Sequence, residues 1–204
     1  MKVVFTVATY YPKTDGVQLV TKYQAEGLVK KGYEVVVITS KFNGTPDEEI
    51  VNGVLVKRVD GYNFYYWHKG NKKQFQSIVK VESKDALALV AVCLQSFAAD
   101  WLLDILDEIE CKKILYLHGM PDFKLHLSDC TTVKKMVKTI FRNTRSKIFY
   151  SLNYYKIKKF DAITHLFKGD NSYKYFTMRG YENNYVIVNA CDDVFFEDVS
   201  EERK

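Results

Sequence analysis

A β-branched and aromatic run at the start of the chain, VVFTV over residues 3–7, most constrains what this sequence can fold into. A run without polar alternation is typical of a strand buried on both faces, as in a parallel sheet. Helical spacing follows Gly16 and ends near Gly32, a residue suited to terminate a helix. A second strand of the same buried type covers residues 34–39. This βαβ opening predicts a parallel sheet, in which the loop before the helix binds anionic ligands.

Strand and helix patterns alternate along the rest of the chain. The remaining strands are predicted over residues 51–60, 86–94, 113–117, 161–166 and 185–188, the first of them after a turn at Asn52 and Gly53. The remaining helices are predicted over residues 74–82, 98–109, 130–160 and 171–178. The aromatic segment 62–67 is expected to form a loop that covers the sheet. This alternation predicts an α/β fold, a doubly wound, Rossmann-like parallel sheet with helices on both faces.

The size and composition of the chain limit its class. Its 204 residues suit one large domain with enough core for such a sheet. The four cysteines include no CxxC pair, so we expect reduced thiols and no metal site. The start MKVVF has no signal-peptide pattern, and no apolar run approaches the ~18–20 residues of a membrane span. We therefore expect a cytoplasmic protein that does not cross a bilayer.

Two common nucleotide-binding motifs are missing from the sequence. The dinucleotide fingerprint GxGxxG does not occur, and neither does the GK[ST] of a P-loop. Sites of these two kinds for NAD and ATP are therefore excluded. A nucleotide-dependent epimerase, which needs the glycine fingerprint, ranks last among the functions considered.

Several short motifs stand in the order that one enzyme family shows. They are residues 10–12 (YYP), 15–17 (DGV), 31–35 (KGYEV), 52–59 (NGVLVKRV), 114–119 (ILYLHG), 160–163 (FDAI) and 185–192 (YVIVNACD), with Phe195. In these motifs the sequence resembles the N-terminal domain of glycosyltransferase family 4, which consists of retaining enzymes with the GT-B fold. Each motif is short, but together they are spread over nearly the whole chain, which the resemblance therefore covers.

The resemblance implies a domain organisation and an activity. Residues 1–190 would be the Rossmann-like N-terminal domain of a GT-B enzyme, and residues 191–204 the start of a linker. The second domain of such enzymes carries most of the nucleotide-sugar contacts, and this chain does not include it. The enzyme would transfer a sugar from a nucleotide-sugar to a glycan or lipid-linked acceptor. An alternative is a non-catalytic carbohydrate- or partner-binding subunit of a split glycosyltransferase.

The resemblance also implies roles for individual residues. His118 ends a buried strand, and it would contact the donor sugar and stabilise charge as the bond to phosphate breaks. Asp15, Gly16 and Val17 would bind the donor. Gly16 is either a turn glycine or the residue that lets a phosphate reach the helix N-terminus. The carboxylate of Asp15, where the family has glycine, would repel a diphosphate unless it points away or serves the acceptor. The residues expected to bind the acceptor are Tyr10, Gln95 and Lys124. Apart from the nucleotide-sugar, which is a substrate, we expect no cofactor or metal.

Positive charge is concentrated in the predicted helix near the end of the chain. Residues 131–160 hold nine of the 30 Lys and Arg and no Asp or Glu, so the net charge of +5 comes wholly from this stretch. We expect its apolar stripe to pack on the sheet and its cations to face outward. A basic face beside aromatic residues predicts peripheral binding to anionic membranes, on the inner face of the membrane, and makes nucleic acid a weaker option. The cations assigned to this surface are Lys134, Lys135, Lys138, Arg142 and Arg145.

Overall fold

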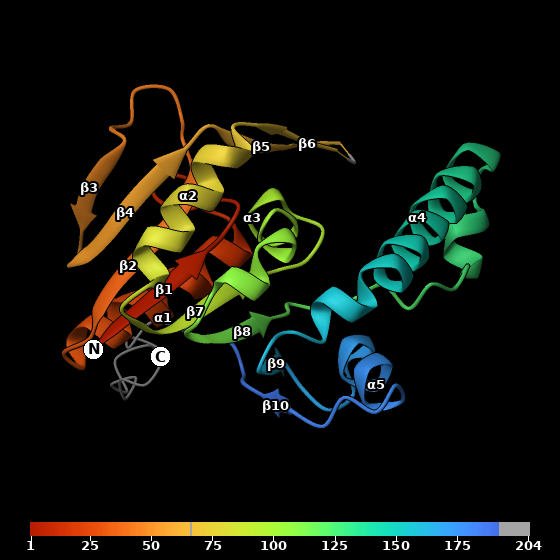
Figure 1. The fold of residues 1–204 in the computed structure, drawn as a ribbon. Helices are drawn as coiled ribbons and strands as arrows, with labels where there is room; N and C mark the ends of the chain where they lie inside the picture. The colour runs from red at the N-terminus through yellow and green to blue at the C-terminus, as the bar shows by residue number, and fades with distance from the viewer. Residues whose placement is uncertain (66, 192–204) are drawn as a thin grey trace, which may run out of the picture.

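The predicted βαβ opening is present in the computed structural model, which describes residues 1–65 and 67–191 (Figure 1). Its three elements are β1 (Lys2–Thr6), α1 (Gly16–Lys30) and β2 (Glu34–Ser40). α1 begins directly after Asp15, whose carboxylate accepts a hydrogen bond from the backbone N–H of Gln18. Gly32 follows the helix with a φ of 83°, a conformation that favours glycine. The sequence prediction of this segment is confirmed.

One eight-stranded sheet organises the described part of the chain. Its other strands are β3 (Glu48–Val51), β4 (Val54–Val59), β7 (Ala86–Val92), β8 (Lys112–Tyr116), β9 (Ala162–His165) and β10 (Asn184–Val186). The strand order is β10-β9-β8-β7-β1-β2-β4-β3, and all neighbours are parallel except β3, which pairs antiparallel with β4. The chain moves outward from β1 first in one direction and then in the other. The predicted doubly wound α/β fold is therefore confirmed, with its topological switch point between β1 and β7.

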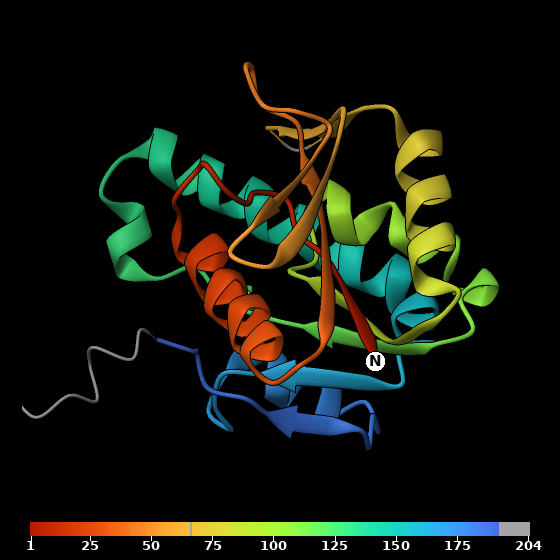
Figure 2. The same ribbon diagram turned by 90° about the vertical axis from the view of Figure 1, so that its left-hand side faces the viewer.

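Helices cover both faces of this sheet (Figure 2). Besides α1 they are α2 (Lys72–Ser83), α3 (Phe97–Asp100), α4 (Val133–Ile157) and α5 (Asn171–Thr177), with the short 3₁₀ helix η3 (Leu127–Cys130) before α4. Alternate residues of β1 enter two separate cores. Phe5 packs beneath α1 with Val20, whereas Val4 packs on the opposite face with Phe75 of α2. Burial on both faces is why the strand sequence shows no polar alternation.

The segment 98–109, predicted as one helix, is irregular. It contains α3 and two 3₁₀ helices, η1 (Leu102–Asp104) and η2 (Leu106–Glu108), so that prediction is wrong. Leu102 and Leu103 are consecutive and both buried, as are Ile105 and Leu106. At about 100° per residue these four side chains would share one broad face of a regular helix, which is why their spacing predicts a helix. Tight turns bring these side chains into the core instead.

The aromatic segment 62–67, predicted as a loop, lies within a β-hairpin. Its strands β5 (Gly61–Phe64) and β6 (Trp67–Gly70) pair antiparallel and form a separate two-stranded sheet. Gly70 has a φ of 117°, and a Cβ atom there would lie 2.1 Å from the carbonyl oxygen of Asp60. Only glycine therefore fits at the base of the hairpin.

The side of α4 that packs against the protein is the opposite of the side predicted to do so. The apolar stripe expected to pack on the sheet is largely exposed, including Val133, Val137, Ile140, Ile148, Leu152 and Tyr155. The buried side carries Thr139, Asn143, Ser146, Tyr150 and Ile157. Polar residues suit this side because much of the surface beneath α4 is loop, whose carbonyls need donors. Asn143 Nδ2, for example, donates to the carbonyl of Lys124 over 2.8 Å.

Two further predictions concern the end of the domain and the crossing of a membrane. Of the predicted linker over 191–204, only Cys191 belongs to the described residues, and Phe195 lies outside them. The domain limit at residue 190 stays a prediction. Within the described ranges, no helix combines the length and the apolar character needed to cross a bilayer.

Candidate functional site

A pocket opens at the carboxyl ends of β1 and β7, at the topological switch point of the sheet. It has a volume of about 330 Å³. Its polar lining consists of Thr9, Asp15, Asn63, Cys93, Gln95 and Ser96. Open α/β sheets bind their ligands at this place, because the loops that follow the two strands diverge there. Three residues predicted to bind ligands from sequence, Asp15, Val17 and Gln95, meet in this pocket.

A second cavity, of about 360 Å³, lies between α1 and the face of the sheet that α1 covers. Phe5, Val90 and Ile114 are among its mostly apolar lining residues. It offers few groups that could orient a polar ligand, so the pocket at the switch point is the better candidate.

The carboxylate of Asp15 occupies the N-terminus of α1. Its Oδ1 accepts a hydrogen bond from the backbone N–H of Gln18 over 2.9 Å, and its Oδ2 accepts one from the hydroxyl of Thr9. The helix end that the sequence predicts as a diphosphate site therefore already holds a negative charge. Donor binding by Asp15, Gly16 and Val17 stays a prediction.

Replacing Asp15 with alanine is expected to lower the free energy of unfolding by about 1 kcal/mol, because α1 loses its N-cap. Asp15→Asn keeps an acceptor oxygen and is the matched control, with an expected loss of less than about 0.5 kcal/mol. Chemical denaturation of both variants measures the difference. Equal losses would show that the charge of Asp15, and not its capping hydrogen bond, stabilises the helix.

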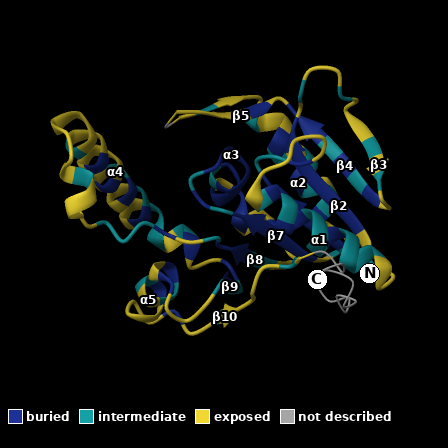
Figure 3. Ribbon diagram, turned by 180° about the vertical axis from the view of Figure 1, so that it is seen from behind, coloured by how far each residue is buried: buried dark blue, intermediate teal, exposed yellow. Residues whose placement is uncertain are grey.

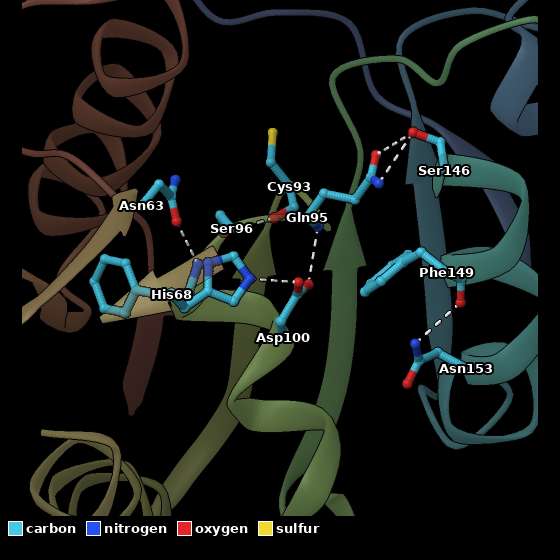
Figure 4. A network of polar contacts seen from close by, with 10 residues as sticks. Asn63, His68, Cys93, Gln95, Ser96, Asp100, Ser146, Phe149 and Asn153 are labelled. Carbon is cyan, nitrogen blue, oxygen red and sulfur yellow. Dashed lines mark hydrogen bonds and ion pairs between the residues drawn. The ribbon is translucent and has the colours of Figure 1, made fainter. Parts of the chain in front are cut away.

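The turn after β7 has an unusual backbone conformation. Cys93 and Gln95 have φ values of 59° and 62°, which are uncommon for residues other than glycine. Asp100 holds this turn, because its Oδ1 accepts a hydrogen bond from the backbone N–H of Gln95 over 2.9 Å (Figure 4). The other carboxylate oxygen lies 2.7 Å from Nε2 of His68, on β6. Conformations of this kind persist where the surrounding contacts enforce them, and they are often found in functional sites.

Neither His68 nor Asp100 was predicted as a site residue from the sequence. The two residues are 32 positions apart, and nothing in the local pattern of either one indicates the contact. Burial raises the pKa of Asp100, while the hydrogen bond from His68 and the positive charge of Arg145 act in the opposite direction. Arg145, predicted to face a membrane, is only partly exposed and lies near this carboxylate.

Gln95 and Asn63 join the turn to neighbouring elements (Figure 4). The side-chain amide of Gln95 donates to Oγ of Ser146, on α4, over 3.1 Å. Oδ1 of Asn63, on β5, accepts a hydrogen bond from the backbone N–H of Phe97 over 2.8 Å. The turn after β7, which lines the pocket, is thus joined to the hairpin on one side and to α4 on the other.

His118 follows β8 at the same edge of the sheet. It is half-buried, its ring packs edge-on against Tyr116 with centroids 4.5 Å apart, and burial lowers its pKa. Nε2 of His118 is buried and has no hydrogen-bond partner among the described residues. A buried polar atom without a partner is a group that a bound ligand can satisfy.

The backbone of His118 hydrogen-bonds to the thiol of Cys93, which places His118 beside the pocket. Burial raises the pKa of this thiol to about 11, so Cys93 stays protonated near neutral pH and is not a nucleophile. Among the described residues, no group of three or more His, Cys, Asp or Glu side chains could hold a metal ion.

Comparison with known proteins shows which solved structures share this fold. No protein-family model and no curated protein sequence matches the chain. The solved structures it resembles include sucrose-phosphate synthase from Thermosynechococcus elongatus, with 10% identity, a TM-score of 0.58, and coverage of 94% of this chain and 48% of that one. A second is the catalytic domain of starch synthase IV from Arabidopsis thaliana bound to ADP and acarbose, with 11% identity, a TM-score of 0.55, and coverage of 98% of this chain and 54% of that one. A third is an alpha-glucosyltransferase in complex with UDP, with 12% identity, a TM-score of 0.55, and coverage of 98% of this chain and 46% of that one. The likeness shows the fold. The chain spans about half the length of these proteins.

Two of the three residues predicted to bind the acceptor lie outside the pocket. The ring of Tyr10 is only 1% exposed in the core beneath α1, and burial raises its pKa. Lys124 is exposed on the loop between β8 and α4. The structure therefore brings Asp15, Val17, Gln95 and His118 to one edge of the sheet. Acceptor binding by Tyr10 and Lys124 stays a prediction.

Proposed function

We propose that the chain is the N-terminal, acceptor-side half of a retaining glycosyltransferase, which moves a sugar from a nucleotide-sugar to a glycan or lipid-linked acceptor. The observation that carries this proposal is the polar pocket at the switch point, with the unpartnered Nε2 of His118 beside it. The resemblance in fold to about half of each of these sugar-transferring enzymes supports it, as do the ADP and UDP that two of those enzymes bind.

The residues of the pocket suit sugar hydroxyls. Amides such as those of Asn63 and Gln95 donate and accept hydrogen bonds, and a carboxylate such as Asp15 accepts them. His118 is neutral near pH 7 because burial lowers its pKa, so one ring nitrogen can donate and the other accept. In the proposed reaction His118 orients the sugar and stabilises charge as the bond to phosphate breaks. The diphosphate binds mainly to a second domain, and the reaction uses no metal.

A non-catalytic subunit that binds carbohydrate or a protein partner is the second candidate. The observation that favours it is Asp15, because its carboxylate occupies the end of α1 and disfavours a phosphate there. Such a subunit would bind a sugar in the same pocket but would not contribute to the chemistry.

Nucleotide release tests the two candidates. We expect the 204-residue chain alone to release no nucleotide from a panel of nucleotide-sugars, because most donor contacts are absent. The same chain joined to its second domain is expected to turn over one member of the panel. Robust turnover by the chain alone would contradict the half-enzyme proposal. Sugar binding without turnover in the complete protein would favour the non-catalytic subunit.

A further inference from the structure

The outward side of α4 has the two-part surface of a helix that lies on a membrane. Its apolar stripe is exposed, with Val137 56% exposed, Ile148 53% and Leu152 75%. Much of α4 is coloured as exposed in Figure 3. Lys134, Lys138 and Arg142 are exposed on the same helix. At about 100° per residue, these cations lie along one side of the stripe. The arrangement matches amphipathic helices that bury an apolar face at the headgroup level and keep cations beside it.

The structure separates the cations that serve the fold from those that do not. Lys156 pairs with Asp104, and Lys159 pairs with Asp107, so these two anchor the end of the helix. No acidic side chain of the described residues lies within ion-pair distance of Lys134, Lys138 or Arg142. These three cations have no role in holding the protein together that the structure shows.

The tip of the β5–β6 hairpin extends the apolar surface. Tyr65 is 87% exposed and Trp67 is 73% exposed, and the hairpin reaches toward α4 in Figure 1. A groove of about 610 Å³ lies between them, with Trp67 on one side and Phe141 and Ile148 on the other. Aromatic residues of this kind suit the boundary between headgroups and acyl chains, because their rings are apolar and their polar atoms stay hydrated.

We propose that the outward side of α4 and the tip of the hairpin form one surface that docks on anionic lipid bilayers. The apolar stripe and Trp67 would enter the headgroup region, and Lys134, Lys138 and Arg142 would contact the anionic headgroups. The proposal does not depend on sugar transfer.

The charge of this surface argues against other occupants. In a two-fold contact with a second copy, the patch would face itself, and the unpaired cations of both copies would come together. Nucleic acid would neutralise the cations but would leave the exposed Ile148 and Leu152 without partners. An anionic bilayer satisfies both halves of the surface.

Fluorescence of Trp67 gives a direct test, because the chain has two tryptophans and the other, Trp101, is only 7% exposed. We expect a blue shift and co-sedimentation with vesicles of phosphatidylcholine and phosphatidylglycerol, but not with phosphatidylcholine alone. Salt is expected to weaken both effects. Co-sedimentation needs no tryptophan variant, whereas Trp101→Phe isolates the signal of Trp67.

Two variants and a matched control locate the surface. Changing Lys134, Lys138 and Arg142 to Gln is expected to weaken vesicle binding at least about tenfold. The same change in charge at Lys84, Lys168 and Lys174, which are exposed elsewhere, is expected to leave it nearly unchanged. Ile148→Ser with Leu152→Ser is expected to remove the blue shift.

Three results would overturn the proposal. They are equal binding to neutral and anionic vesicles, no binding to either, and a shift of Trp67 emission that depends on protein concentration without lipid. The last would instead assign the surface to a second copy of the chain.

Discussion

Replacing His118 with alanine is expected to lower the turnover number of the proposed glycosyltransferase by about 10²–10³-fold, as for other losses of a preorganised hydrogen-bond donor. Nε2 of His118 is buried without a partner among the described residues, beside the pocket at the switch point. A group that acts in the transition state lowers kcat and kcat/KM together, whereas a group that only binds substrate raises KM. Steady-state kinetics therefore separates these two roles.

His126→Ala is the matched control for this experiment. His126 is exposed on the loop before α4, where it pairs with Asp122, and it is expected to leave kcat unchanged. Circular dichroism and thermal unfolding establish that the His118 variant is folded. A folded variant that keeps its turnover number would limit His118 to a structural role.

Replacing Phe97 with alanine is expected to lower the free energy of unfolding by about 3–5 kcal/mol. Phe97 is fully buried, and its ring makes edge-on contacts with Phe75 and Trp101. It also supports the hairpin, because a Cβ atom on Gly61 would lie only 2.7 Å from its ring. Removing the ring leaves a cavity between α2, α3 and the hairpin. Such a loss is a large part of the roughly 5–15 kcal/mol that stabilises a typical domain.

Phe64→Ala provides the comparison, because Phe64 is in the same hairpin but 43% exposed. Its replacement is expected to cost less than about 1 kcal/mol. Denaturant titration of both variants measures the two losses. Similar values for Phe97 and Phe64 would mean that the aromatic cluster does not hold the hairpin to the rest of the protein.

Much of the fold could be predicted from the sequence, because burial on both faces leaves a direct signature. β1 and β2 are continuous apolar or β-branched runs, and the turn at Asn52 and Gly53 joins β3 to β4 as its residues indicate. The irregular shape of segment 98–109 and the buried side of α4 could not be predicted in the same way. Which side of a segment is buried depends on what lies across from it, and local periodicity does not contain that information.

The residues of the candidate site likewise include some that could be predicted from the sequence and some that could not. Asp15, Val17 and His118, which the resemblance indicated, follow a strand or begin a helix at the edge where such sheets bind ligands. Asp100 and His68 form the support for the turn at Gln95, and their contact joins elements that are distant in the chain. No short-range pattern records a pair of that kind.

The carboxylate of Asp15 has a consequence for which molecules can enter the pocket. Because it belongs to the same chain as the helix that it caps, it competes with dissolved anions at an effective concentration on the order of millimolar or higher. A small anion such as phosphate, binding to the helix end alone, would have to displace this intramolecular competitor. A larger ligand that also gains contacts elsewhere along the pocket is favoured in that exchange, so we expect the pocket to discriminate by the size of its ligand as well as by charge.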